Sequence, residues 1–121
     1  MPSIFEATAD KALGYVSGGA VTQATNKSTG VTLNQPCGQI TMNNAALAAA
    51  AEVSFVVTNS FCTAGDVVLV NHGSVGSAGS YIVQANLIAD GSFKITVSNV
   101  SAGSLSEAIV LNFAIMKAAA A

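Results

Sequence analysis

Hydrophobic and polar residues alternate in several short segments of the chain, a pattern typical of strands that bury one face. The clearest example is 92–99, where Phe93, Ile95 and Val97 alternate with lysine, threonine and serine. Polar turn residues separate such segments at intervals of about 8 to 12 residues, as in a β-sandwich or a jelly roll. The pattern predicts strands at 20–25, 30–35, 37–42, 52–59, 66–71, 80–88, 92–99 and 107–116.

Local signals add detail to several of these segments. The continuous apolar run at 66–71 predicts a central strand, and Asp90-Gly91 predicts a tight hairpin after 80–88. The Ala-rich segment 43–52 begins with an asparagine suited to cap a helix, so it predicts one or two helical turns. Within 80–88 the alternation places four side chains on one inner face: Tyr81, Val83, Ala85 and Leu87.

The first nineteen residues show no regular period and end at Gly18-Gly19. We therefore expect residues 1–19 to form an N-terminal arm and residues 20–121 to form one domain. That domain is predicted to be all-β, a sandwich or jelly-roll-like fold of about eight short strands with one short Ala-rich helical turn. We hypothesise that the arm docks on a partner through its scattered apolar residues, which are Ile4, Phe5, Leu13, Tyr15 and Val16.

Charge is scarce in this chain. Charged residues make up 8% of the sequence, against about 25% in an ordinary domain. The net charge is −2 and the four lysines are dispersed, which argues against a nucleic-acid partner. No apolar run approaches the roughly 20 residues of a membrane-spanning helix, so no membrane partner is expected. A surface so poor in charge suits a protein covered by copies of itself or by a larger assembly.

Several apolar residues fall on the outward-facing positions of the predicted strands. A sandwich with apolar side chains on both faces of some strands needs a second contact, most simply a neighbouring subunit. We therefore expect a homo-oligomer. The hypothesised interface comprises Val56, Ile82, Val110, Ala114 and Met116.

Candidate catalytic residues are few. A nucleophilic Cys37 would need a nearby base, and neither Lys27 nor His72 is tied to it by spacing. His72 has Asp66 before it and a serine after it, but residues of one strand and its loop rarely converge into a triad. We therefore expect no enzyme, no cofactor and no metal site, and we interpret Pro36-Cys37-Gly38 as a corner between strands.

The location of synthesis bears on the two cysteines. Residues 1–19 lack the basic start and continuous apolar stretch of a signal peptide, so we expect synthesis in a cytoplasm. In that compartment Cys37 and Cys62 would remain thiols.

Three stretches carry a resemblance to a known family. They are "VTQATNKSTGVTLN", "CGQITM" and "SAGSLSEAIVLNFA", within a match that covers most of 18–118. The chain resembles a module of tailed-bacteriophage virion proteins, often described as head fibre or capsid decoration (cement) proteins. The N-terminal 17 residues lie outside this resemblance.

The resemblance implies a function and a partner. Such decoration proteins are β-rich homotrimers that sit on the capsid exterior, bind the major capsid protein and stabilise the lattice. It therefore implies a virion structural protein made in the cytoplasm of a bacterial host. The alternative is a tail or head fibre domain for host-surface adhesion, acting through exposed loops such as 73–80.

Overall fold

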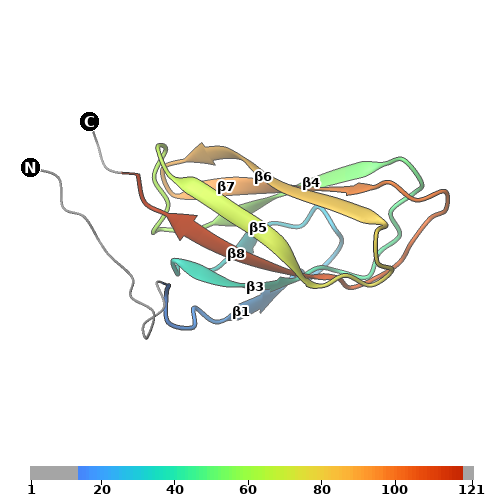
Figure 1. Ribbon diagram of the computed structural model, residues 1–121, viewed down its shortest axis with the longest axis horizontal. Coiled ribbons are helices and arrows are strands. Elements are labelled where there is room, and N and C mark those ends of the chain that lie inside the picture. Colours follow the sequence, from blue (N-terminus) through green and yellow to red (C-terminus); the bar gives the residue numbers. More distant parts are fainter. Residues whose placement is uncertain (1–13, 119–121) are drawn as a thin grey trace, which may run out of the picture.

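The computed structural model describes residues 14–118, and within that range it is all-β, as predicted. Figure 1 shows two layers of strands, with both ends of the described chain at the same end of the layers. The described residues form eight strands and no helix: β1 (Ala20–Thr22), β2 (Val31–Thr32), β3 (Cys37–Thr41), β4 (Glu52–Thr58), β5 (Val67–Ser74), β6 (Tyr81–Ala89), β7 (Ser92–Asn99) and β8 (Val110–Met116).

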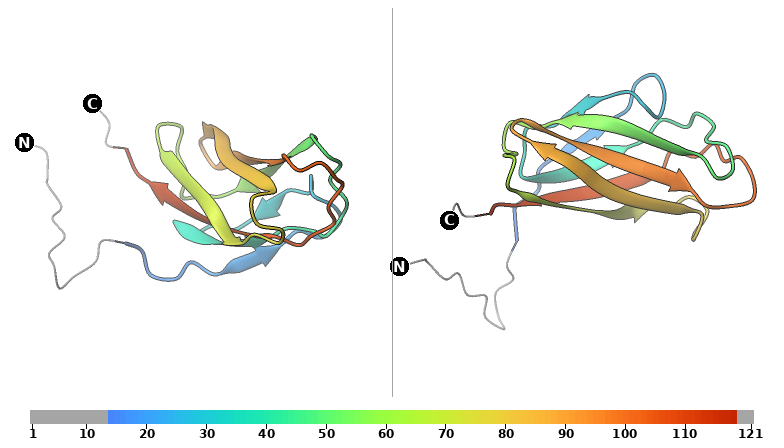
Figure 2. Two further views of the ribbon diagram at one scale, coloured as in Figure 1. Left: turned by 45° about the vertical axis from the view of Figure 1, so that its right-hand side comes forward. Right: turned by 90° about the horizontal axis from the view of Figure 1, so that it is seen from above.

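The strands form two four-stranded sheets that face each other in a sandwich (Figure 2). One sheet has the order β1-β3-β8-β5 and the other the order β2-β4-β7-β6. β1 pairs with β3 and β2 pairs with β4 in parallel, while every other pairing is antiparallel. The first sheet therefore has β3 and β8 in its interior, with β1 and β5 at its edges.

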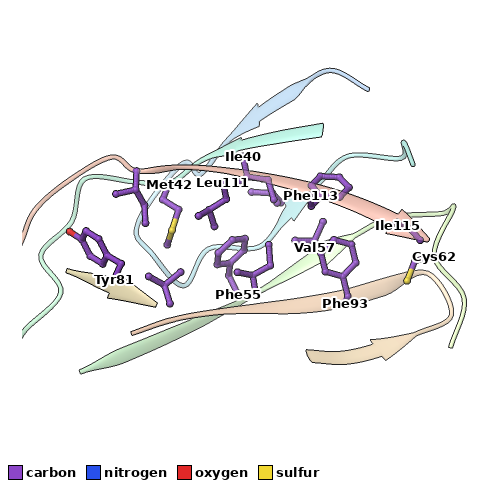
Figure 3. Packing of buried hydrophobic residues seen from close by; sticks show 14 of the residues in the cluster. Ile40, Met42, Phe55, Val57, Cys62, Tyr81, Phe93, Leu111, Phe113 and Ile115 are labelled. Carbon is purple, nitrogen blue, oxygen red and sulfur yellow. The ribbon is translucent and has the colours of Figure 1, made fainter. Parts of the chain in front are cut away.

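The predicted alternation is confirmed in the strands that build the core. Phe93, Ile95 and Val97 of β7 are fully buried, and so are Leu111 and Ile115 of β8. The two sheets meet through large side chains, shown in Figure 3. An example is the pair Phe93 and Phe113, whose ring centroids lie 5.5 Å apart. Burying one such side chain contributes roughly 1.5–3 kcal/mol to stability.

The helical turn predicted at 43–52 is wrong. Leu47 instead exchanges two backbone hydrogen bonds with Leu105, at 2.8 and 3.0 Å, and its side chain is buried. Asn43 closes a local turn by accepting a hydrogen bond from the backbone of Ala45 at 2.8 Å. A contact 58 residues away in sequence thus overrides the helical preference of the alanines.

The prediction that 66–71 is a central strand is also wrong. This run belongs to β5, which pairs only with β8 and forms an edge of its sheet. Alternate residues of the run point outward, so Val67 and Leu69 are 50% and 54% exposed. His72, which follows the predicted strand 66–71, lies within β5.

The hairpin at Asp90-Gly91 is confirmed, but a register shift just before it alters which of the last residues of β6 point inward. Ala89 pairs with Ser92 across the turn, and Gly91 has a φ of 84°. The register shifts between Asn86 and Ala89, so Leu87 has a φ of 48° and is 69% exposed. Ile88 packs against the core in its place, and the predicted inward position of Leu87 is therefore wrong.

Buried asparagines hold the loops together. Asn99 donates from Nδ2 to the backbone oxygens of Leu47 and Gly103, at 2.8 and 2.9 Å. Asn59 donates from Nδ2 to the backbone oxygen of Gln35 at 2.7 Å. A buried amide satisfies backbone groups of separate loops without the desolvation cost of a charge.

Residues 14–19 lie against the start of β3, where the backbones come unusually close. A Cβ atom placed on Gly18 would lie 1.6 Å from the backbone oxygen of Cys37. The chain bends at Gln35 and Pro36 immediately before β3, in agreement with the predicted corner. Glycine at position 18 is therefore required by space.

We expect Gly18→Ala to destabilise the domain by about 1–3 kcal/mol, because residues 14–19 must move away from β3. Thermal unfolding followed by circular dichroism measures the effect. Gly65→Ala is the matched control, since a Cβ there meets no atom within 4 Å. Equal melting temperatures for the two variants would contradict the close approach at Gly18.

Candidate interaction surface

The hypothesised interface does not form one patch. Val110, Ala114 and Met116 of β8 lie on the outer face of the β1-β3-β8-β5 sheet, because the alternate residues Leu111, Phe113 and Ile115 are buried in the core. Val56 and Ile82 lie on the outer face of the other sheet. The structure thus brings three of the five residues together and separates the other two from them by the thickness of the sandwich.

We call the outer face of the β1-β3-β8-β5 sheet the β8 face. Strand register places its residues side by side across four strands. None of them is charged. They are Ala20, Thr22, Cys37, Gln39, Thr41, Val67, Leu69, Asn71, Val110, Asn112, Ala114 and Met116.

The β8 face has an apolar end. Val67 pairs with Met116, and Leu69 is in register with Ala114 and Cys37. Leu69 is 54% exposed and Met116 is 56% exposed. An open hollow of about 460 Å³ lies here, lined by Gly14, Tyr15, Cys37, Leu69, Ala114, Ile115 and Met116.

A row of amides crosses the middle of the β8 face. Asn71, Asn112 and Gln39 are in register on β5, β8 and β3. Each amide carries both donors and acceptors, so the row can pair with another polar surface without charge. Two further shallow hollows lie over this region, and Asn112 contributes to both.

Of the five arm residues predicted to dock on a partner, the structure describes Tyr15 and Val16. The Tyr15 hydroxyl donates to the backbone oxygen of Ile115 at 2.5 Å, and its ring meets Phe61 edge-on with centroids 6.2 Å apart. Val16 is 88% exposed. Tyr15 is therefore attached to the sandwich beside the hollow. The remaining three residues lie outside the described part of the chain: Ile4, Phe5 and Leu13.

The outer face of the other sheet is more polar. It carries Glu52 and Lys94 among hydroxyl side chains, and Thr96 accepts from Asn86 at 2.8 Å. Val56 stands opposite Lys94 in the register, and Ile82 stands opposite a serine. Val56 and Ile82 therefore have charged or polar partners in the register, whereas the exposed Val67 and Leu69 of the β8 face have apolar partners.

The candidate chemical residues do not converge. Asp66 precedes the eight-residue strand β5 and Ser74 ends it, so the two lie about 26 Å apart at ~3.3 Å per residue. The His72 side chain lies on the inner face of β5, and its Nε2 is buried without a hydrogen-bond partner. Among residues 14–118, no group of three or more histidine, cysteine or acidic side chains is placed to hold a metal ion.

Both cysteines are free thiols, as expected. Burial, assisted by the nearby Asp66 carboxylate, raises the pKa of the Cys62 thiol, which favours the unreactive protonated form. Cys37 is partly exposed on the β8 face, and its Sγ donates to the backbone oxygen of Val16 at 3.3 Å. The described residues include no helix long and apolar enough to cross a membrane.

One end of the sandwich is closed by an ion pair. We call it the terminal end, because Tyr15, Met116 and Lys117 lie there. Lys117 Nζ lies 2.7 Å from the buried Asp66 carboxylate and 5.0 Å from the centre of the Phe61 ring. The hydrogen bond from Lys117 lowers the pKa of Asp66 to about 2.

The opposite end, which carries the loop 75–80, is closed by a second charged cluster. We call it the loop end. The Lys27 ammonium is buried and donates to the backbone oxygens of Asn43 and Glu107. The Glu107 carboxylate accepts from Ser77 at 3.1 Å and from Tyr81 at 2.7 Å. Burial and this carboxylate raise the pKa of Tyr81 to about 12.

Neither charged cluster was predicted from the sequence. Asp66 and Lys117 lie 51 residues apart along the chain, and Lys27 and Glu107 lie 80 residues apart.

No family model, no curated protein and no solved structure matches the chain.

We expect Asp66→Asn to lower the melting temperature at pH 7, because the Lys117 ammonium loses its ionised partner. The lowered pKa of Asp66 means that its contribution to stability is complete above about pH 4 and is lost as pH falls toward 2. The difference in melting temperature between wild type and Asp66→Asn should therefore shrink over that interval.

Glu52→Gln is the matched control for this measurement, since it removes an exposed carboxylate on β4. A melting-temperature difference between wild type and Asp66→Asn that stays constant from pH 5 to pH 2 would contradict the role assigned to the ion pair.

Proposed function

We propose that this protein is a virion structural protein of a tailed bacteriophage that coats the outside of the capsid as a homo-oligomer. The observation that carries the proposal is the β8 face, an uncharged surface with large exposed apolar side chains on a domain whose reactive groups are dispersed. The resemblance of 18–118 to decoration modules supports it, and it also suggests a trimer and the major capsid protein as partner.

The terminal end suits contact with a shell. Tyr15 and Val16 expose apolar surface there, and residues 1–13 precede them in the chain. At ~3.3 Å per residue those 13 residues can span at most about 43 Å. The hypothesised docking residues Ile4 and Phe5 belong to this segment.

Coating a capsid does not require a strong single contact. A lattice presents many identical sites, and an oligomer that engages several of them gains from a high effective concentration. A modest apolar contact at the terminal end of each subunit therefore suffices for stable coating. Catalytic groups have no part in such a function.

The alternative, host-surface adhesion, is favoured by one observation at the loop end. Glu107 fixes the loop 75–80 by binding Ser77 and Tyr81, and Gly76 and Gly79 adopt positive φ angles of 61° and 79°. An exposed loop held in one shape on a rigid scaffold is suited to recognition. The two functions assign contact to opposite ends of the same sandwich, so one experiment separates them.

The test is co-sedimentation of the purified protein with capsids from which it has been removed. We expect saturable binding at a fixed ratio to the major capsid protein. Deletion of residues 2–13 should abolish binding while retaining the fold, because the deletion spares Tyr15 and its hydrogen bond to Ile115. Circular dichroism and light scattering verify fold and mass.

Val75→Asp changes the exposed loop at the other end and serves as the control that should still coat. Undiminished coating by the deletion variant would contradict docking through the arm. A full-length protein that ignores capsids and binds host cells through 75–80 would establish adhesion instead.

A further inference from the structure

We propose that the β8 face is the surface through which one copy of this chain contacts a second copy. The proposal gives a location to the self-association that the proposed function assumes. It depends on the chemistry of the surface alone and can be tested without capsids. The occupant of the face is a second molecule of the same protein.

The first argument is the distribution of charge. In the described part of the chain, Glu52 and Lys94 lie on the opposite face, and the remaining charged side chains lie at the two ends or in the β6–β7 turn. The β8 face has none. Covering it therefore desolvates no charged group, and burying an unpaired charge is costly when an interface forms.

The second argument is the match between the face and a copy of itself. The exposed Leu69 and Met116 need an apolar surface, and the amides of Asn71, Asn112 and Gln39 need donors and acceptors. A second β8 face supplies both kinds of group without introducing a charge. Because both molecules use the same face, the contact joins two copies as a two-fold dimer and not as the trimer that the resemblance suggests. Protein surfaces that recognise a different partner more often rely on complementary charges, which this face lacks.

The third argument is size. The four strands contain 3, 5, 7 and 8 residues, and at ~3.3 Å per residue and about 4.8 Å between strands they cover roughly 360 Å² in projection. Side-chain relief and the adjoining residues 14–19 increase that area. A stable interface buries about 800 Å² on each partner, so the β8 face supplies a large part of one such interface and the adjoining residues 14–19 supply more.

The N-terminal residues of the chain fit the β8 face less well. Residues 1–13 carry Glu6, Asp10 and Lys11 within six positions. Laying this segment across the face would bring those charges onto uncharged strands. A second copy covers both the hollow beside Tyr15 and the amide row without bringing a charge onto the face.

The experiment compares two substitutions of similar exposure on opposite faces. Leu69 on β5 is 54% exposed and Ile82 on β6 is 58% exposed. Leu69→Lys places an ammonium in the proposed interface, and Ile82→Lys places the same group on the other face. Masses are measured by light scattering and sedimentation equilibrium over a range of protein concentrations.

We expect the wild type and Ile82→Lys to have the same oligomeric mass. Leu69→Lys should dissociate toward the monomer, with a dissociation constant raised by roughly a hundredfold because the buried ammonium lacks a partner. Thermal unfolding establishes that each variant is folded. Met116→Lys, near the end of β8 and 56% exposed, replaces Leu69→Lys if that variant does not fold.

Three results would overturn the proposal: a monomeric wild type at every concentration, an unchanged mass for Leu69→Lys and Met116→Lys, or dissociation by Ile82→Lys. An oligomer that obeys the expected pattern but does not bind capsids would refute the proposed function and leave this interface in place.

Discussion

The pairing of β8 with β3 on one side and β5 on the other is the constraint on which both the core and the β8 face depend. Leu111, Phe113 and Ile115 fill the interior only because this register turns them toward the second sheet. A slip of one residue would reverse the two faces of the strand and expose the largest core side chains. The same register aligns Leu69, Ala114 and Cys37 on the outside, so core packing and surface chemistry are fixed together.

Different kinds of interaction stabilise the sheets, the loops and the two ends of this fold. The sheets are held by apolar packing and backbone pairing, and the loops are held by buried amides such as Asn59 and Asn99. Charges are concentrated in the clusters that close the two ends, around Lys27 and around Asp66. One large sheet surface is therefore free of charge even though the chain carries charged residues of both signs.

Much of the fold could be predicted from the sequence because strand alternation is a local property. Phe93, Ile95 and Val97 reveal their inward face by spacing alone, and Asp90-Gly91 marks its turn. Two of the errors arose where a distant contact decides the outcome. The predicted helical turn does not form because Leu47 pairs with Leu105. The apolar strand β5 is an edge strand because it pairs with β8 alone.

The candidate surface was predictable only in part for the same reason. Alternation identifies Ile82 and Ala114 as outward-facing, but only sheet membership shows that they belong to opposite faces. The charged clusters at the ends depend on loops that meet in space, and no spacing rule relates Lys27 to Glu107 or Asp66 to Lys117.

The closeness of Tyr15 and Met116 at one end of the sandwich has a practical consequence for protein engineering. A fluorescent protein or affinity tag joined at either end of the described chain would emerge at the same end of the sandwich (Figure 1). The loop 75–80 lies at the other end and is anchored by Glu107. A short foreign peptide inserted there would be presented far from both junctions, which makes this loop the natural site for displaying an epitope.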